Sequence, residues 1–144
     1  MRSATMGITY AEIELTRGDD LALFREGYIP ENRVRRIIVR ALVDSGASML
    51  SITPAVRDYL DLPKVDEQQA ELADGSVAQF DVVGPVELRF ENRKTVEYAI
   101  VVPNSPDVLL GAHPMQDLDV LVDPKREVLI VNPKSPDIAR KFLK

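Results

Sequence analysis

Short runs of Val, Ile and Leu, separated by Pro, Gly, Asn and Asp, recur along the whole chain. This pattern is typical of an all-β protein, because strands are short and the turns between them need residues with unusual backbone angles. Residues 8–16 alternate apolar and polar side chains, which predicts a first strand, and residues 35–43 predict a second. Further strands are predicted at residues 49–52, 76–83, 86–90, 95–102, 108–110, 120–122 and 128–131.

Helix signals are confined to short segments. Thr53 suits an N-cap and Pro54 fits the first helical position, where its missing N–H costs nothing, so a helix is predicted over residues 54–60. A second short helix is predicted over residues 113–118. Residues 18–32 are charged and irregular, and we expect an extended surface connection there, with room for one helical turn at residues 21–25.

An Asp-Gly pair at residues 74 and 75 separates two extended arms, residues 68–73 and 76–83. Asp-Gly is a strong hairpin signal, because a type I′ turn needs a positive φ at both of its central residues. The sequence therefore predicts a hairpin with this pair at its tip. The hairpin could be a lid over a site or an exposed turn without function, and the sequence pattern favours neither.

Length and composition narrow the class of protein. A chain of 144 residues predicts one domain over residues 1–144, with a core of about residues 8–132 and a tail or terminal helix at residues 133–144. The net charge of −5 argues against nucleic acid or an anionic membrane as a partner. With no cysteine and one histidine, we expect no disulfide, no metal and no cofactor. The first residues carry no long apolar segment, so we expect a cytoplasmic protein.

The chemistry of the chain centres on one aspartate. An apolar strand runs directly into Asp44, Ser45 and Gly46, which places a carboxylate at a tight turn. Such a carboxylate is costly unless it is hydrogen-bonded, paired or used, so Asp44 is a candidate general acid or base. The alternative is a turn aspartate that caps backbone amides, which is the commoner role of an isolated Asp-Ser-Gly. The context favours chemistry, because the hairpin and a second apolar strand that ends in glycine follow.

Three elements in this order resemble the retropepsin-like aspartic proteases. They are Asp44-Ser45-Gly46-Ala47 after a strand, the hairpin around Asp74-Gly75, and Leu109-Leu110-Gly111 before a short helix. The resemblance covers about residues 8–132 and is nearest to the bacterial single-domain members. It implies a mainly β fold with one or two short helices, a closed barrel, and a homodimer that acts as an aspartic endopeptidase on a peptide or protein substrate.

The resemblance also implies roles for single residues. Two adjoining carboxylates cannot both ionise cheaply, so the family's paired aspartates share a proton and activate a water. One motif per chain then requires two copies, each contributing Asp44 as the catalytic residue. Ser45 and Gly46 would support the catalytic loop, and Ala47, Ser48, Ala73, Asp74, Gly75 and Ser76 would bind substrate. Leu109, Leu110 and Gly111 would buttress the loop, although simple core packing explains them equally well.

The chain also departs from the family pattern. Retroviral members carry an arginine directly after the second glycine, paired with an acidic residue just past the first motif, and here these places hold Ala112 and Ser48. Two other hypotheses therefore stand beside the protease. One is a catalytically silent dimerisation or peptide-binding module, and the other is an unrelated β-barrel in which Asp44 caps a turn. His113 is interpreted as a structural or surface residue.

Overall fold

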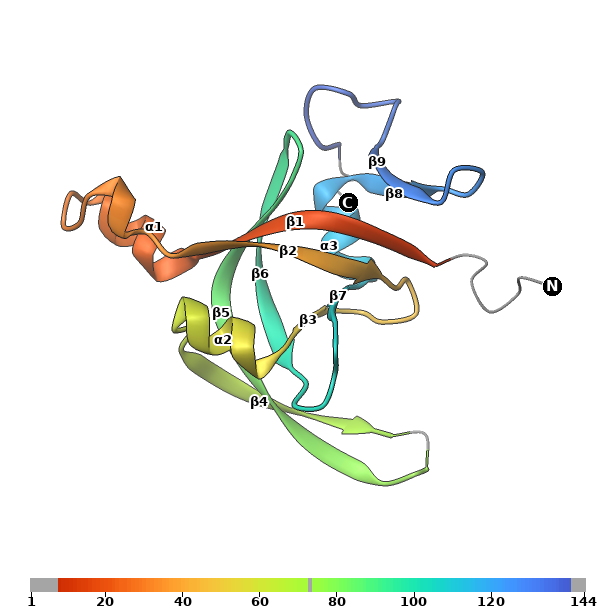
Figure 1. Cartoon of the computed structure of the whole chain (residues 1–144), viewed down its shortest axis with the longest axis horizontal. Coiled ribbons are helices and arrows are strands. Elements are labelled where there is room, and N and C mark those ends of the chain that lie inside the picture. The colour runs from red at the N-terminus through yellow and green to blue at the C-terminus, as the bar shows by residue number, and fades with distance from the viewer. Residues whose placement is uncertain (1–7, 73, 141–144) are drawn as a thin grey trace.

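Six strands close into a barrel in the computed structural model, which describes residues 8–72 and 74–140 (Figure 1). The helices are α1 (Gly18–Arg25), α2 (Pro54–Leu60) and α3 (Ala112–Leu118), and a 3₁₀ turn, η1, covers Glu31–Arg33. The strands are β1 (Thr9–Arg17), β2 (Arg36–Val43), β3 (Leu50–Ile52), β4 (Lys64–Glu71), β5 (Val77–Phe90), β6 (Arg93–Val101), β7 (Val108–Leu110), β8 (Val120–Asp123) and β9 (Val128–Val131).

The barrel runs in the order β1-β2-β7-β3-β6-β5 and closes where β5 pairs back onto β1. β5 is 14 residues long and takes part in two structures. Its second half pairs with β6 and β1, whereas its first half pairs with β4 and leaves the barrel as a hairpin. The predicted strands at residues 76–83 and 86–90 are thus one strand, with an irregularity between Val83 and Val86. The prediction of a mainly β closed barrel with short helices is confirmed.

The core follows from the alternation in the strands. In β1 the buried apolar side chains are Ala11, Ile13 and Leu15, while the residues between them are exposed or half-buried; Thr9 and Thr16 are buried as well. Each fully buried aliphatic side chain contributes about 1.5–3 kcal/mol relative to an exposed one. Leu60 of α2 and Leu118 of α3 belong to the same core, so both helices are anchored on the barrel.

The predicted helix at residues 54–60 is confirmed as α2. The Thr53 side-chain oxygen accepts a hydrogen bond from the Val56 N–H at 3.2 Å, as an N-cap should. The helix ends at Asp61, which adopts a left-handed conformation with φ of 51°.

The expectation of an extended connection after β1 is wrong over residues 18–20, where α1 begins, whereas the helical turn allowed for at residues 21–25 is found as the rest of this helix, Gly18–Arg25. The reason is Asp20, which is only 3% exposed and accepts hydrogen bonds from the Arg17 guanidinium at 2.8 Å and the Arg35 N–H at 2.9 Å. Burial alone would raise the pKa of the Asp20 carboxyl, but these hydrogen bonds and the two guanidinium charges outweigh it and lower that pKa. In Figure 1, α1 lies at the end of the β1–β2 pair where β1 ends and β2 begins.

The last two strands pair with each other as predicted. β8 and β9 form a separate antiparallel pair, with Val120 opposite Val131. The sequence leaves a tail or a terminal helix open for residues 133–144. The described part of this segment, residues 133–140, contains no helix. Within the described residues, none of the helices is long and apolar enough to cross a membrane.

Candidate active site

The Asp44 loop, defined as residues 44–49, joins β2 to β3. β7 lies between these two strands, parallel to β2 and antiparallel to β3. The Asp44 N–H also donates to the Leu110 carbonyl at 3.0 Å, which continues the β2–β7 ladder into the loop. One short apolar strand therefore fixes both ends of the loop.

Asp44 itself is half-buried and forms a tight turn. Its Oδ1 accepts the Gly46 N–H at 2.9 Å, and its carbonyl accepts the Ala47 N–H at 3.1 Å. A Cβ on Gly46 would lie 3.1 Å from the same Oδ1, so glycine suits this close approach. The described residues place no hydrogen bond on the other oxygen, Oδ2. Asp44 thus caps an amide, as the turn hypothesis expects, and keeps one oxygen for other chemistry.

The loop is also tied to the start of α3. The Ala112 N–H donates to the Ala47 carbonyl at 2.8 Å, and the His113 N–H donates to the Ser48 carbonyl at 2.9 Å. Where retroviral proteases would place an ion pair, two main-chain hydrogen bonds therefore join the same two segments. The exposed His113 side chain takes no part in this connection.

Gly111 allows the loop and the helix to come this close. A Cβ at Gly111 would lie 2.4 Å from the Met49 carbonyl oxygen and 2.8 Å from the Ala47 carbonyl oxygen. Leu110 is fully buried in the core. The structure places Leu110 and Gly111 against the Asp44 loop, whereas Leu109 pairs with Leu42 and Ser51 on the strands before and after it. The buttressing role of the three residues remains a prediction, and Leu110 packs in the core as well.

The exposure of the loop bears on its predicted roles. Ser45, Gly46 and Ser48 are exposed, and Ala47 is half-buried. The backbone of Ala47 and Ser48 is held by α3, so their predicted contact with substrate would involve side chains and the remaining main-chain groups. That role remains a prediction.

The hairpin of β4 and β5 has a three-residue tip rather than the predicted two-residue turn. Glu71 pairs with Val77, and the Leu72 N–H donates to the Ser76 carbonyl at 2.8 Å, so three residues lie between them. Gly75 has φ of 87°, the left-handed conformation that such a loop requires. Of the predicted tip residues, Asp74, Gly75 and Ser76 are exposed, and Ala73 lies outside the described residues.

Asp74 explains why the longer loop is preferred. Its Oδ1 accepts hydrogen bonds from the Ser76 hydroxyl at 2.6 Å and the Ser76 N–H at 2.9 Å. These two bonds lower the pKa of the Asp74 carboxyl. Figure 1 shows the hairpin projecting from the barrel, with its tip toward the same side of the view as the Asp44 loop.

A groove of about 340 Å³ runs beside the Asp44 loop. It is lined by Ser45, by Ala112, Met115 and Gln116 of α3, and by Val120, Leu121 and Val122 of β8. Leu121 is 38% exposed, a high value for a leucine. Sequence reasoning did not single out these residues, although the apolar run 120–122 directly after the short helix was the available signal.

Metal ligands are not gathered at this site or elsewhere in the described ranges. No group of three or more His, Cys, Asp or Glu side chains in residues 8–72 and 74–140 lies close enough to hold an ion.

Comparison with known proteins identifies one family. The model of the family described as gag-polyprotein putative aspartyl protease matches residues 33–117, which is more than half of the chain. The matched segment begins just before β2, includes the Asp44 loop and the hairpin, and ends within α3. No curated protein matches the chain.

Proposed function

Because the chain belongs to the retropepsin-like aspartic protease family, we propose that it is a homodimeric endopeptidase with an active site of two Asp44 carboxylates, one from each copy. The observation that carries this proposal is the position of Asp44. It stands at the end of a barrel strand, in a loop fixed by β7 and α3, with Oδ2 free of hydrogen bonds from the described residues.

The reaction follows from the pairing of the two carboxyl groups. Two carboxylates in contact share one proton, because the second ionisation would place like charges side by side. The ionised group takes a proton from a water molecule that attacks the scissile carbonyl carbon. The protonated group donates to the carbonyl oxygen, which yields the tetrahedral intermediate, and proton transfer to the nitrogen then releases the amine.

Holding the two groups in this geometry needs a rigid loop, and three hydrogen bonds support that requirement: the one the Leu110 carbonyl accepts from the loop and those that the Ala112 and His113 N–H groups donate to it. The hairpin tip of Ala73, Asp74, Gly75 and Ser76 would close over an extended peptide and exclude water. Ala47 and Ser48 would contact the peptide from the opposite side.

The second copy has a suitable place to dock. The groove beside Ser45 is mainly apolar and adjoins the loop that must approach the twofold axis. An isologous contact brings the same surface from both chains to that axis, so each Leu121 would be covered as the two Asp44 loops meet. This surface supports the proposed homodimer although Ala112 and Ser48 carry no charges with which to form an ion pair.

The decisive experiment compares Asp44→Asn with Asp58→Asn on an unfolded protein substrate. Asp58 is an exposed aspartate on α2, paired with Arg57, and serves as a matched control. We expect Asp44→Asn to abolish cleavage while the far-UV circular dichroism spectrum and the dimer mass stay unchanged. Undiminished cleavage by Asp44→Asn would refute the proposal.

Mixing wild type with Asp44→Asn tests the shared site. If two Asp44 residues are needed per site, an equal mixture that exchanges subunits retains about one quarter of the activity of the same total amount of wild type. If each chain works alone, it retains about one half. A dimer that never cleaves would instead favour the alternative, a catalytically silent dimerisation or peptide-binding module.

A further inference from the structure

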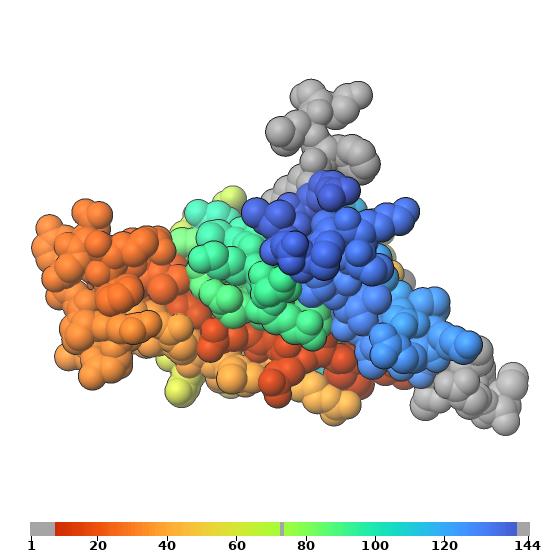
Figure 2. Space-filling model, turned by 90° about the horizontal axis from the view of Figure 1, so that it is seen from above, coloured from red at the N-terminus to blue at the C-terminus, as the bar shows by residue number. Residues whose placement is uncertain are grey.

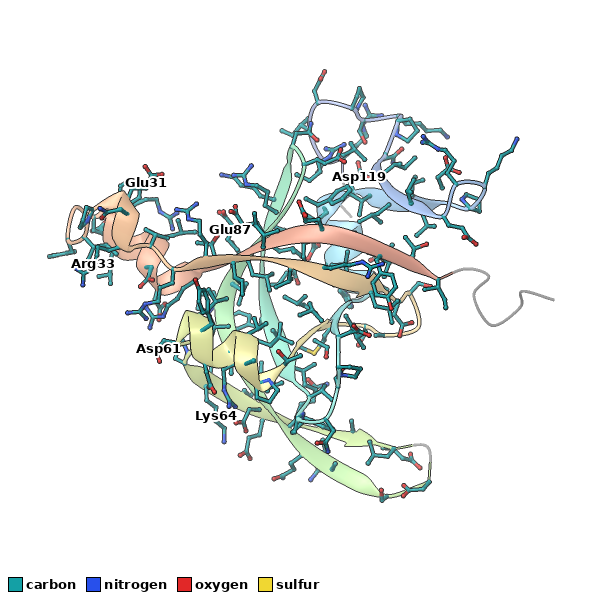
Figure 3. The ribbon with its side chains drawn as sticks, in the orientation of Figure 1. Glu31, Arg33, Asp61, Lys64, Glu87 and Asp119 are labelled. Atoms are coloured by element: carbon teal, nitrogen blue, oxygen red, sulfur yellow. The ribbon has the colours of Figure 1, made fainter. Side chains whose placement is uncertain are left out.

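A second polar cluster joins one residue inside the segment that matches the protease family to three residues that follow that segment. We call it the polar clip and define it as Arg93, Asp119, Asn132 and Ser135. Asp119 follows α3 directly and precedes β8, whereas Asn132 and Ser135 follow β9. Figure 3 labels Asp119 between α3 and the C-terminal residues, and Figure 2 shows those residues against the turn between β5 and β6.

Asp119 is the hub of the clip. Its Oδ1 accepts the Asn132 side-chain amide at 3.0 Å, and its Oδ2 accepts the Ser135 hydroxyl and the Arg140 N–H, the latter at 2.9 Å. The Asn132 N–H also donates to the Asp119 carbonyl at 3.1 Å. Both carboxylate oxygens are therefore used, and all of these donors come from the segment after β9.

Arg93 closes the clip from the barrel side. It is only 2% exposed, and its guanidinium donates to the Ser135 carbonyl. Its Nε and Nη1 are buried without a hydrogen-bond partner among the described residues. The Arg93 charge makes a small contribution to lowering the pKa of the Asp119 carboxyl, and this attraction offsets part of the cost of burying the guanidinium. The Asn92 side chain adds a hydrogen bond to the Pro136 carbonyl at 2.9 Å.

α3 links the clip to the Asp44 loop. The helix has seven residues, and its two ends are held differently. At its first turn, Ala112 and His113 donate to the carbonyls of Ala47 and Ser48. At its other end, Asp119 adopts φ of 56° and carries the clip. Rigid secondary elements that join two sites are among the structures that carry energetic coupling between them.

The geometry points to Asp119 as a positioning residue for the Asp44 loop, acting through α3 and held in place by the C-terminal segment through Ser135 and Asn132. Docking of residues 132–140 thereby sets the position of the loop that carries Asp44. The same contact sets the start of β8, and with it the groove beside Ser45. The effect on catalysis rests on the proposed function, whereas the coupling between the clip and the loop does not.

The first test measures hydrogen exchange of the Ala112 and His113 amides in Asp119→Ala. The matched control is Asp123→Ala, which removes a carboxylate from the other end of β8, where it bonds to Arg126. We expect the two amides to exchange at least ~5-fold faster in Asp119→Ala, since one lost hydrogen bond changes an opening equilibrium by about that factor. In Asp119→Ala the amides of β1 and β2 should exchange at the wild-type rate. In Asp123→Ala the Ala112 and His113 amides should do so as well.

The second test measures kcat and KM on a peptide substrate at saturating dimer concentration and at a temperature where every variant is folded. A displaced loop should lower kcat on the order of tenfold or more, with a much smaller change in KM. Asp119→Asn keeps one acceptor oxygen, so we expect it to recover part of the loss. If Asp119→Ala fails to fold, Ser135→Ala carries the same measurements.

Two results would overturn the inference. One is a uniform rise in exchange at all barrel amides, which would make Asp119 a residue for stability alone. The other is wild-type kcat in a variant whose Ala112 and His113 amides exchange faster. A wild-type protein that cleaves nothing would refute the proposed function only, because the exchange measurement still tests the coupling.

Discussion

Replacing Gly111 by alanine tests how tightly the Asp44 loop and α3 are packed. The added Cβ would lie 2.4 Å from the Met49 carbonyl oxygen, 2.8 Å from the Ala47 carbonyl oxygen and 2.9 Å from the Met49 nitrogen. All three are backbone atoms, so no side chain can rotate away. Since ordinary contacts begin near ~3.4 Å, the loop would have to retreat by about 1 Å.

The cost can be worked from these contacts. Overpacking of this kind costs about 1–3 kcal/mol. The retreat also weakens the hydrogen bonds from Ala112 and His113 to the loop, at about 1 kcal/mol each. Alanine also reduces the conformational freedom of the unfolded chain, which stabilises the protein by about 0.5–1 kcal/mol. The expected net loss in the free energy of unfolding is therefore about 2–4 kcal/mol. For a chain of this length, that loss lowers Tm by about 8–15 °C.

Urea unfolding followed by far-UV circular dichroism measures this loss, since the chain contains no tryptophan. Gly27→Ala is the control, because Gly27 has φ of 84° and no atom within 4 Å of an added Cβ. Its loss of about 1 kcal/mol reflects backbone conformation alone. A loss for Gly111→Ala no larger than that of the control would refute the argument from close packing.

Three further predictions concern the helices and the clip. Thr53→Ala should lower the free energy of unfolding by about 1 kcal/mol, and Thr53→Ser should restore most of it, as urea titration will show. Leu60→Ala should cost about 2–5 kcal/mol in the same assay, because it leaves a cavity where α2 meets the core. The hydrogen bonds from Ser135, Asn132 and the Arg140 N–H lower the pKa of Asp119 from 3.8 to about 2. The native state therefore holds the ionised form more strongly than the unfolded chain, and this contribution is present above pH 4 and lost as the pH falls toward 2. The difference in unfolding free energy between wild type and Asp119→Asn, measured from pH 6 to pH 2, should narrow over that interval, and a constant difference would contradict the assignment.

Much of the fold is local enough to be predicted from the sequence. Alternation and short apolar runs identify the strands, and Thr53 with Pro54 marks the start of α2, because each signal acts within a few residues. The resemblance to the retropepsin-like proteases is likewise confirmed by the family match. The roles of the individual site residues and the homodimer stay predictions.

Two of the parts that were missed depend on partners distant in the sequence, and a third depends on local side-chain geometry. α1 has no clear apolar face, and it is held by Asp20, whose partner Arg35 lies 15 residues away. The three-residue tip of the hairpin depends on how the Asp74 side chain bonds to Ser76, which the Asp-Gly pair alone does not reveal. The polar clip joins Arg93 to Ser135, which are 42 residues apart, so no local sequence pattern predicts this contact.

The position of β7 also governs the order in which the site can be assembled during synthesis. β2 and the Asp44 loop leave the ribosome early, but the Leu110 carbonyl and the Ala112 and His113 amides that hold the loop follow more than 60 residues later. Until then β2 and β3 lack the strand that lies between them. A nascent chain therefore carries Asp44 without the hydrogen bonds that hold its loop in the folded protein, and such non-local pairing forms late.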